Sequence, residues 1–268
     1  MNKKDLPIGF YDSGVGGLNV LYETEKLLPH ENFIYYGDLL HAPYGEKSEE
    51  EILQLSLMAG EFLFEKGVKA IVIACNTATS IAVNLMREKY RFPVISIEPA
   101  VKPAVEKYAD GDILVLATPA TLGQKRYKSL KDRLAANSRV TDISCGGLAE
   151  LVEGGAQSGV VRQYLAEKFA PFKNREVQGI VVGCTHYSFI SGEIYNTAKE
   201  YFSGPCEIFD GKNGTARHIK WVLEREGLLS GRSEKGTLRF YASGEGDASG
   251  KMEAYYRRIR EADPFWRG

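Results

Sequence analysis

The sequence predicts an α/β protein with parallel sheets, built from two similar halves. Most of its apolar segments are continuous runs of Val, Ile, Leu, Phe and Tyr, which is typical of strands buried on both faces of a parallel sheet. Helical patterns lie between these runs, as in doubly wound α/β proteins. The segment KAIVIACNT (69–77) also returns as QGIVVGCTH (178–186). We therefore expect two pseudo-symmetric Rossmann-like or flavodoxin-like domains.

Seven segments are expected to form strands, and helices are expected between them. Ser48 and Glu51 form a capping box, and apolar residues then recur at helical spacing until Gly67 ends this helix. A second helix is predicted over 77–90 and another over 213–227. The expected strands, in chain order, are residues 7–12, 33–37, 69–75, 93–97, 112–117, 177–184 and 206–209.

The internal repeat indicates where the domains divide. Cys75 aligns with Cys184, an offset of 109 (184 minus 75), and Asp12 aligns more loosely with Thr118, an offset of 106 (118 minus 12). The Glu98-Pro99 pair breaks the pattern between the two copies. We expect a first domain of residues 1–97 plus about 207–268, a second domain of residues 98–206, and an active site in the cleft between them.

Composition excludes several classes of partner. The 268 residues carry a formal net charge of −1 and no basic tract, which argues against binding to nucleic acid or to an anionic membrane. The N-terminal segment has no apolar stretch typical of a signal peptide, and no apolar run approaches the roughly 18 residues of a membrane span. We expect a cytoplasmic protein.

The four cysteines do not form a recognisable disulfide or zinc pattern. Cys75, Cys145, Cys184 and Cys206 lie far apart, and none belongs to a CxxC pair. In a reducing compartment they are free thiols, and most free thiols are buried, inert side chains. No metal site is expected.

Polar residues gather where four of the predicted strands end, at the edge where open α/β sheets bind ligands. The first strand runs into DSGVGG (12–17), which is neither a dinucleotide fingerprint nor a phosphate-binding P-loop. The third and sixth strands end in the two repeated cysteines, and the fifth ends before a threonine pair. The candidate residues at these ends are Asp12, Ser13, Cys75, Asn76, Thr77, Thr118, Thr121, Cys184, Thr185 and His186.

Two thiols presented by a duplicated fold suit one reaction well. Cys75 and Cys184 each follow a buried strand, and a helix N-terminus favours the thiolate form of cysteine. One base can remove a proton from one face of a carbon while the other delivers a proton to the opposite face, which is racemisation. The neighbouring hydroxyl and amide groups can stabilise the charge that develops on a substrate carboxylate.

The motifs that carry this chemistry resemble those of glutamate racemases, in the aspartate/glutamate racemase superfamily. They are DSGVGG (12–17), APYGEKS (42–48), ACNTAT (74–79), ELVEGG (150–155) and GCTHY (183–187), and the resemblance covers about residues 7–217. It implies that Cys75 handles the α-proton of D-glutamate and that Cys184 handles that of L-glutamate. It also implies that Asp12 assists Cys75, and that Glu153 and His186 assist Cys184.

The resemblance extends to the substrate and its biological use. It implies interconversion of L- and D-glutamate without any cofactor, supplying D-glutamate to peptidoglycan. We also expect a homodimer. Substrate contacts are implied for Asp12, Ser13, Pro43, Tyr44, Gly45, Asn76, Thr77, Thr118, Thr121, Thr185 and His186.

Three other functions are compatible with parts of the sequence. An aspartate racemase or another two-cysteine racemase would use the same chemistry, although His186 directly after Cys184-Thr185 favours glutamate. A non-catalytic binding protein of the same fold would not need both cysteines, and both are present. A pyridoxal-phosphate enzyme needs a Schiff-base lysine, and none stands at these strand ends.

Overall fold

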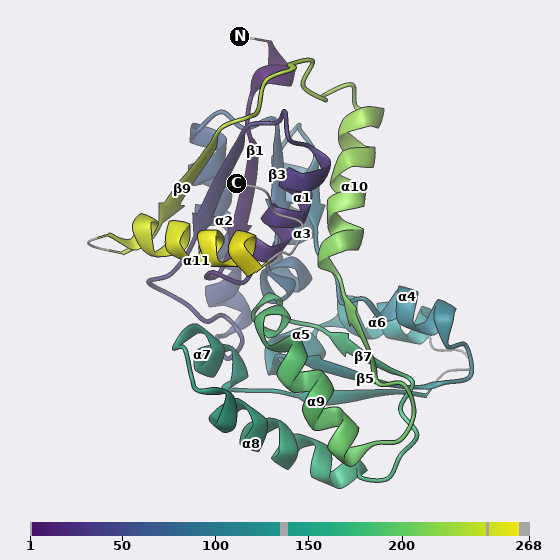
Figure 1. The fold of residues 1–268 in the computed structure, drawn as a ribbon. Coiled ribbons are helices and arrows are strands. Elements are labelled where there is room, and N and C mark those ends of the chain that lie inside the picture. Colours follow the sequence, from purple (N-terminus) through teal and green to yellow (C-terminus); the bar gives the residue numbers. More distant parts are fainter. Residues whose placement is uncertain (1, 135–138, 245–246, 263–268) are drawn as a thin grey trace. The chain divides into compact units, whose positions relative to one another are not determined.

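The computed structural model describes residues 2–134, 139–244 and 247–262, which form two compact units (Figure 1). The first unit comprises the chain up to Tyr44, then Glu49–Ile97 and the segment from Lys212 onward. The second unit comprises Gly45–Ser48 and Glu98–Gly211. The first unit is therefore discontinuous, because the chain leaves it and later returns to complete it.

The first unit is built on a five-stranded parallel sheet with the order β4-β3-β1-β2-β9. Every residue of the central strand β1 is buried, as expected for a strand covered on both faces. Edge strand β9 comes from the C-terminal part of the chain and pairs with β2. The strands are β1 (Ile8–Asp12), β2 (Phe33–Gly37), β3 (Ala70–Ile73), β4 (Val94–Ser96) and β9 (Leu238–Ala242).

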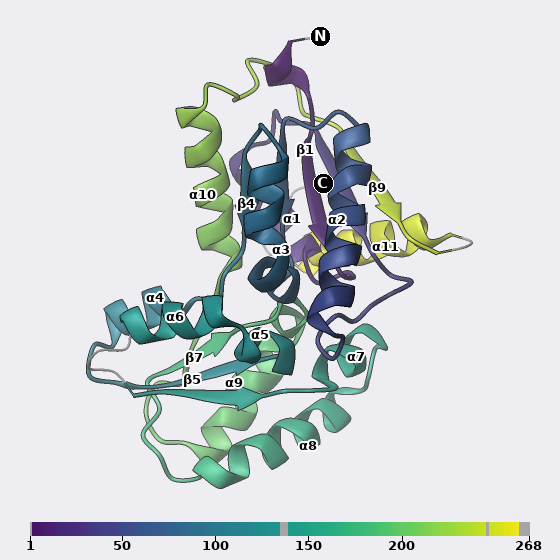
Figure 2. The same ribbon diagram turned by 180° about the vertical axis from the view of Figure 1, so that it is seen from behind.

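Helices cover both faces of this sheet. On one side α1 packs against α10 and α11, and on the other side α2 packs against α3 (Figures 1 and 2). Helix α11 also contacts β9, so the last helix and the last strand form one C-terminal addition to the sheet. The helices are α1 (Leu18–Leu27), α2 (Glu49–Glu65), α3 (Asn76–Lys89), α10 (Lys212–Arg225) and α11 (Ala248–Ala262), preceded by a short 3-10 turn, η1 (Lys3–Asp5).

The second unit holds a four-stranded parallel sheet with the order β6-β5-β7-β8. Successive residues of β5 point to opposite faces, so that Leu114 and Leu116 join one buried cluster while Ile113 and Val115 join another. This sheet is therefore also buried on both faces. The strands are β5 (Asp112–Ala117), β6 (Arg139–Ser144), β7 (Gly179–Val182) and β8 (Glu207–Asp210).

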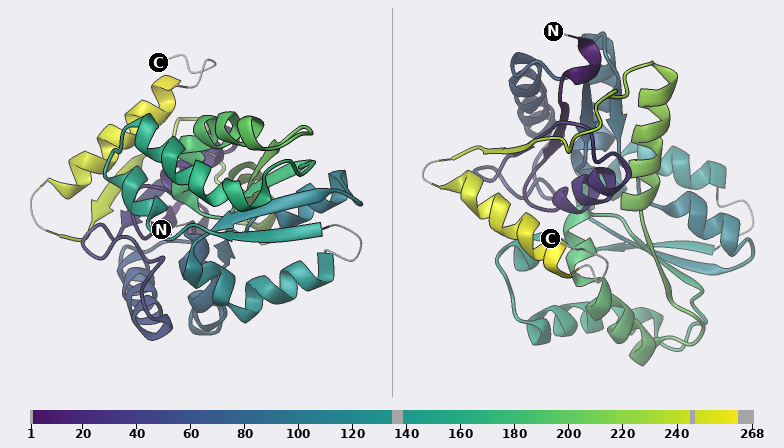
Figure 3. Two further views of the ribbon diagram at one scale, coloured as in Figure 1. Left: turned by 90° about the horizontal axis from the view of Figure 1, so that it is seen from below. Right: turned by 45° about the horizontal axis from the view of Figure 1, so that its top comes forward.

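Two groups of helices cover the second sheet (Figures 2 and 3). The larger cluster lies under α7, α8 and α9, and the smaller one under α4 and α6. The helical segments are α4 (Val101–Lys107), α5 (Pro119–Gly123), α6 (Lys125–Leu134), α7 (Leu148–Glu153), α8 (Ser158–Phe169) and α9 (Ser191–Tyr201), with 3-10 turns η2 (Ala170–Phe172) and η3 (Thr185–Ile190).

The strand orders of the two sheets correspond. The order β4-β3-β1-β2 in the first unit matches β8-β7-β5-β6 in the second, so each central strand is flanked by equivalent neighbours. Ile8 pairs with Ala70 in the first sheet, and Ile113 pairs with Gly179 in the second. The ladders thus relate β3 to β7 by 109 residues (179 minus 70) and β1 to β5 by 105 (113 minus 8), which is one residue less than the sequence alignment of Asp12 with Thr118 gives.

All seven predicted strands are present, and the described residues contain two further strands that were not predicted. The missed strands are β6 and β9, which lie at sheet edges and show half-buried rather than continuous apolar patterns. The predicted strand 69–75 ends at Ile73, so Cys75 stands beyond the sheet rather than within it. Across the described ranges, no helix combines the length and apolar character needed to cross a lipid bilayer.

Candidate active site

In the first unit, Cys75 stands at the start of a helix. It is the N-cap of α3, and its Sγ accepts a long hydrogen bond from the backbone N–H of Ala78 at 3.5 Å. A helix N-terminus stabilises negative charge, and here that charge would fall on a sulfur atom that is nearly buried. The thiol therefore occupies a position that favours its reactive, anionic form.

At the end of β1, Asp12 and Ser13 lie at the same edge of the sheet as this thiol. Ser13 Oγ is 3.4 Å from Cys75 Sγ. Asp12 is fully buried, and its Oδ1 accepts the backbone N–H of Gly14 at 2.8 Å. Asp12, Ser13 and Cys75 are thus brought together at the carboxyl ends of β1 and β3, which are neighbours in the sheet.

The residues after Cys75 form the first turn of α3. Asn76 and Thr77 are both buried. Asn76 Oδ1 is a buried oxygen with no hydrogen-bond partner. Because buried polar atoms are nearly always paired, this oxygen is a candidate acceptor for a group that a ligand would bring.

Sequence reasoning missed Tyr11, which precedes Asp12 on β1. Its ring is fully buried, and its hydroxyl lies 3.1 Å from Ser56 Oγ. Burial, and then negative charge on Cys75, raise the pKa of Tyr11 well above its ordinary value. Tyr11 therefore stays neutral beside the thiol, and its place one residue before a strand-end aspartate was the only sequence signal.

The PYG stretch divides between the two units, with Pro43 and Tyr44 in the first and Gly45 in the second. The Ala42–Pro43 peptide bond is cis. The side chain of Tyr44 is buried, and its hydroxyl donates to Asp38 Oδ2 at 2.5 Å. Tyr44 thus points its ring into the first unit, and only its backbone is left for the substrate contact that the resemblance implies.

In the second unit, Cys184 follows β7 just as Cys75 follows β3. His186 Nδ1 lies 3.9 Å from Cys184 Sγ, and His186 Nε2 lies 2.7 Å from Glu153 Oε2. His186 is buried, while Glu153 ends α7. The three side chains form a thiol–imidazole–carboxylate series, and it includes Glu153, whose position in the sequence alone gave no reason to select it.

The pKa of His186 is set by competing effects. Burial by itself lowers it, but hydrogen bonds to Cys184 and Glu153, together with their negative charges, raise it well above its ordinary value. A protonated His186 beside a thiolate and a carboxylate can stabilise negative charge on the sulfur or help return a proton to it.

One local feature differs from the first unit. Cys184 opens the six-residue 3-10 turn η3 rather than a long α-helix, and its side chain caps no backbone N–H group. At this thiol, a protonated His186 can supply the positive charge that a helix N-terminus supplies at Cys75.

The threonine pair also lies in the second unit. Thr118 is the N-cap of α5, where its Oγ1 accepts the backbone N–H of Thr121 at 3.2 Å and donates to Thr121 Oγ1 at 3.0 Å. Gly45 O accepts the N–H of Ala120, and a Cβ at Gly45 would lie 2.9 Å from Thr118 Cγ2. Thr118 and Gly45 are therefore closely packed. Thr185, next to Cys184, is buried as well.

The other two cysteines have a different environment. Cys145 belongs to the larger apolar cluster of the second unit, and burial raises the pKa of its thiol to about 12. Burial also raises the pKa of Cys206. Both are expected to remain protonated and unreactive at neutral pH.

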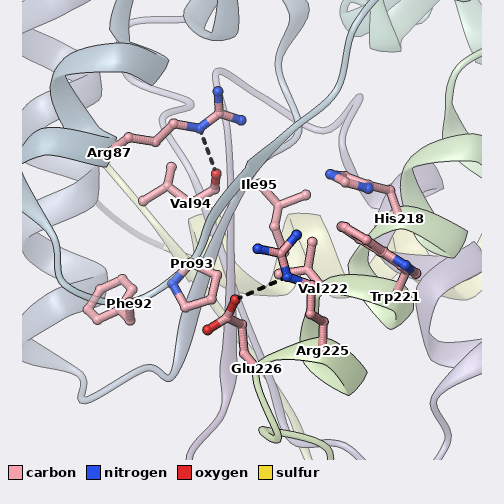
Figure 4. A pocket seen from close by; sticks show the side chains of 10 residues that line it. All are labelled: Arg87, Phe92, Pro93, Val94, Ile95, His218, Trp221, Val222, Arg225 and Glu226. Atoms are coloured by element: carbon pink, nitrogen blue, oxygen red, sulfur yellow. Dashed lines mark hydrogen bonds and ion pairs between the residues drawn. The ribbon is translucent and has the colours of Figure 1, made fainter.

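A hollow of about 520 Å³ lies elsewhere in the first unit (Figure 4). Phe92 and Pro93 stand before β4, at the opposite end of the strands from Cys75, and Trp221 on α10 forms another wall. None of the predicted site residues lines this hollow. In the described ranges, no group of three or more His, Cys, Asp or Glu side chains is arranged to hold a metal ion.

Comparison with known proteins identifies the family. The model of Asp/Glu/Hydantoin racemase matches residues 20–211. A glutamate racemase of Clostridium botulinum is 46% identical over 246 residues, which cover 91% of this chain and 94% of that protein. A crystal structure of a glutamate racemase isoform from Bacillus anthracis has a TM-score of 0.83 at 28% identity, covering 97% of this chain and 96% of that one.

A second solved structure carries a ligand. The glutamate racemase of Francisella tularensis, in complex with D-glutamate, has a TM-score of 0.80 at 28% identity, covering 95% of this chain and 94% of that one. The family match spans both repeated cysteines and most of the chain. This chain therefore belongs to the Asp/Glu/hydantoin racemase family.

Proposed function

We propose that this protein is a cofactor-independent glutamate racemase that interconverts L- and D-glutamate. One observation carries the proposal: the two units have equivalent strand orders, and each places a thiol two residues beyond the equivalent strand, Cys75 after β3 and Cys184 after β7. Membership of the racemase family and 46% identity to a glutamate racemase support the choice of reaction and substrate.

In this mechanism the two thiols serve one substrate and exchange roles between directions. With L-glutamate, the Cys184 thiolate takes the α-proton, and the electron pair left on Cα spreads into the carboxylate. The Cys75 thiol then gives its proton to the opposite face of Cα, which yields D-glutamate and a Cys75 thiolate. Conversion of D-glutamate runs the same steps in reverse.

The surrounding groups adjust charge at each sulfur. His186, oriented by Glu153, stabilises the Cys184 thiolate, and the α3 N-terminus stabilises the Cys75 thiolate. Asp12 assists Cys75. Because the enzyme must stabilise extra charge on a carboxylate, the neutral donors around the site provide the main electrostatic help.

Substrate binding is assigned to the strand-end residues. The unpaired Asn76 Oδ1 suits the ammonium group of an amino acid, which can donate a hydrogen bond to it. The other proposed contacts are Ser13, Pro43, Tyr44, Gly45, Thr77, Thr118, Thr121 and Thr185. Asp12 and His186, which assist the two thiols, are proposed to contact the substrate as well.

We propose further that the product supplies peptidoglycan synthesis in the cytoplasm. The two compact units are proposed to be the two domains expected from the duplication. The protein is also proposed to act as a homodimer. Sedimentation velocity tests the assembly directly. A single species at the monomer mass of 29.7 kDa would contradict the dimer.

The decisive experiment follows α-proton exchange by NMR in D2O, without added cofactor. With L-glutamate we expect D-glutamate carrying deuterium at Cα. The circular dichroism signal of the glutamate should decay to zero as the two enantiomers reach equal concentrations. L-aspartate is the comparison substrate, and a higher kcat/KM for aspartate would favour the aspartate racemase alternative. If neither substrate exchanges its α-proton, the racemase proposal fails.

Cysteine variants test the mechanism separately. Cys75→Ala and Cys184→Ala should each reduce kcat by at least about 10³-fold, since a positioned proton donor or acceptor is lost. Cys145→Ala is the matched control, because its thiol lies in the apolar cluster and should leave kcat within about twofold of the original. Full activity in either Cys75→Ala or Cys184→Ala would refute the two-thiol mechanism.

A further inference from the structure

A buried carboxylate lies at the base of the PYG segment and has no part in the proton transfers proposed above. Asp38 directly follows β2 and is 3% exposed. Its backbone N–H donates to Asp12 O at 3.0 Å, which ties it to the strand end that bears the candidate aspartate. Burial of a carboxylate is costly unless hydrogen bonds compensate, so the partners of Asp38 indicate what it does.

Three side chains converge on this carboxylate. Tyr44 Oη donates to Oδ2 at 2.5 Å, Ser243 Oγ donates to Oδ1 at 2.5 Å, and His41 Nδ1 lies 2.8 Å from Oδ1. Two of the three, His41 and Tyr44, come from the segment that follows Asp38. The carboxylate thus holds both ends of a short loop that includes Pro43.

Tyr44 is fixed by its whole side chain. It is 1% exposed, and its ring centroid is 6.4 Å from that of Tyr11. Burial, and then negative charge nearby, raise the pKa of Tyr44, so that its hydroxyl keeps the proton it donates to Asp38. With the ring held in this way, the backbone of Pro43 and Tyr44 has one defined position.

Ser243 brings a distant part of the chain into this arrangement. It follows β9, and its N–H donates to Gly37 O at 3.1 Å. Its Oγ donates to Asp38 and also accepts the backbone N–H of Leu40 at 2.9 Å. The hydroxyl of Ser243, directly after the C-terminal strand β9, therefore bonds at the same time to the Asp38 carboxylate and to the loop backbone at Leu40.

We propose that Asp38 and Ser243 are positioning residues for the substrate, acting through Tyr44 to fix the backbone of the PYG segment. The inference rests on the proposed function, since it assumes that this backbone contacts glutamate. Neither residue touches the reacting atoms. Their loss should weaken substrate binding while the thiols still transfer protons.

The test compares KM with kcat for D- and L-glutamate in four variants. Tyr44→Phe and Ser243→Ala each remove one hydroxyl from Asp38 and should raise KM about tenfold while kcat changes less than about threefold. Ser243→Thr restores a hydroxyl and should return KM to within about twofold of the original value.

Tyr256→Phe is the matched control. Its hydroxyl also donates to a carboxylate, that of Glu25, at 2.5 Å, and it is likewise buried, but it lies on α11, where its ring contacts Tyr22 and Phe240. Its removal should lower thermal stability to a similar degree and leave KM unchanged. A KM for Tyr44→Phe and Ser243→Ala equal to that of Tyr256→Phe would overturn the inference, and so would failure of Ser243→Thr to restore KM.

Failure of the inference can be separated from failure of the proposed function. If the original protein does not racemise glutamate, the proposed function itself is wrong. If it does, and the two loop variants bind glutamate normally, only the positioning role is wrong. Should Tyr44→Phe not fold, Ser243→Ala carries the same comparison, because its side chain is smaller and lies at the end of an edge strand.

Discussion

Replacing Lys69 with Met should destabilise the first unit strongly, because it breaks a buried ion pair. Lys69 and Glu31 side chains are only 1% and 3% exposed. Lys69 Nζ donates to Glu31 Oε2 and, at 2.6 Å, to the backbone O of Lys4. Glu31 Oε1 in turn accepts the N–H of Ser230 at 2.7 Å. The pair therefore joins four separate segments of the chain.

The expected loss of stability follows from the buried carboxylate of Glu31, which Lys69→Met leaves without its ion-pair partner. Burial lowers the pKa of Lys69, while its hydrogen bond and ion pair with Glu31 oppose that shift. Without the lysine, the nearly inaccessible carboxylate of Glu31 loses its ion-pair partner, while the Ser230 N–H remains as a hydrogen-bond donor to it. Removing one partner of a buried pair costs about 3–5 kcal/mol, and we expect the free energy of unfolding of Lys69→Met to fall by that amount.

Urea unfolding followed by circular dichroism measures the change, and two further variants interpret it. Lys69→Met combined with Glu31→Gln removes the charge but keeps an acceptor for Ser230, and should recover most of the loss. Lys89→Met breaks an ion pair that is 46% and 43% exposed and should cost about 1 kcal/mol or less. A loss for Lys69→Met no greater than that for Lys89→Met would refute the reasoning.

Two other substitutions test local packing and charge. Gly17→Ala would place its Cβ 2.8 Å from Ala74 Cβ and 2.7 Å from Asp12 Cβ, so the free energy of unfolding should fall by about 1–3 kcal/mol and kcat should decrease. In the control Gly214→Ala, the new Cβ has no atom within 4 Å, and the protein should not be destabilised. Thermal unfolding of the two variants measures the difference. In Glu153→Gln, part of the pKa elevation of His186 is lost. A raised histidine pKa gives stability that is complete below about pH 6.5 and is lost as pH rises through the folded-state pKa. The stability difference between the original protein and Glu153→Gln should thus be constant at low pH and shrink as the pH rises from the His186 pKa of the variant to that of the original protein, and a difference that stays constant into the alkaline range would contradict this assignment.

The fold could be predicted wherever burial on both faces produced continuous apolar runs. The edge strands β6 and β9 were not predicted because polar residues such as Asp142 and Arg239 break their apolar pattern, whereas the other two edge strands, β4 and β8, keep short apolar runs. β9 is also separated from its partner β2 by most of the chain, and no local pattern could indicate that pairing.

The part of the candidate site that could be predicted consists of reactive side chains placed directly after predicted strands. Cys75 and Cys184 combine a reactive side chain with a repeated setting, and each stands two residues beyond the equivalent strand of its sheet. Glu153 and Asp38 could not be selected in this way, because their roles depend on contacts with His186 and Ser243 across 33 and 205 residues. Asp38 nevertheless follows a predicted strand directly, as Asp12 does, and that signal could have drawn attention to it.

The discontinuity of the first unit has a consequence for synthesis on the ribosome. Residues 98–211, with all four strands of the second sheet, emerge before α10, β9 and α11 exist. The second unit can therefore complete its sheet during translation, while the N-terminal strands must wait with the edge of β2 uncovered. Nascent chains that stop before residue 238 should remain protease-sensitive in the N-terminal segment. Chains that include β9 should be protected there, because β9 pairs with the edge of β2.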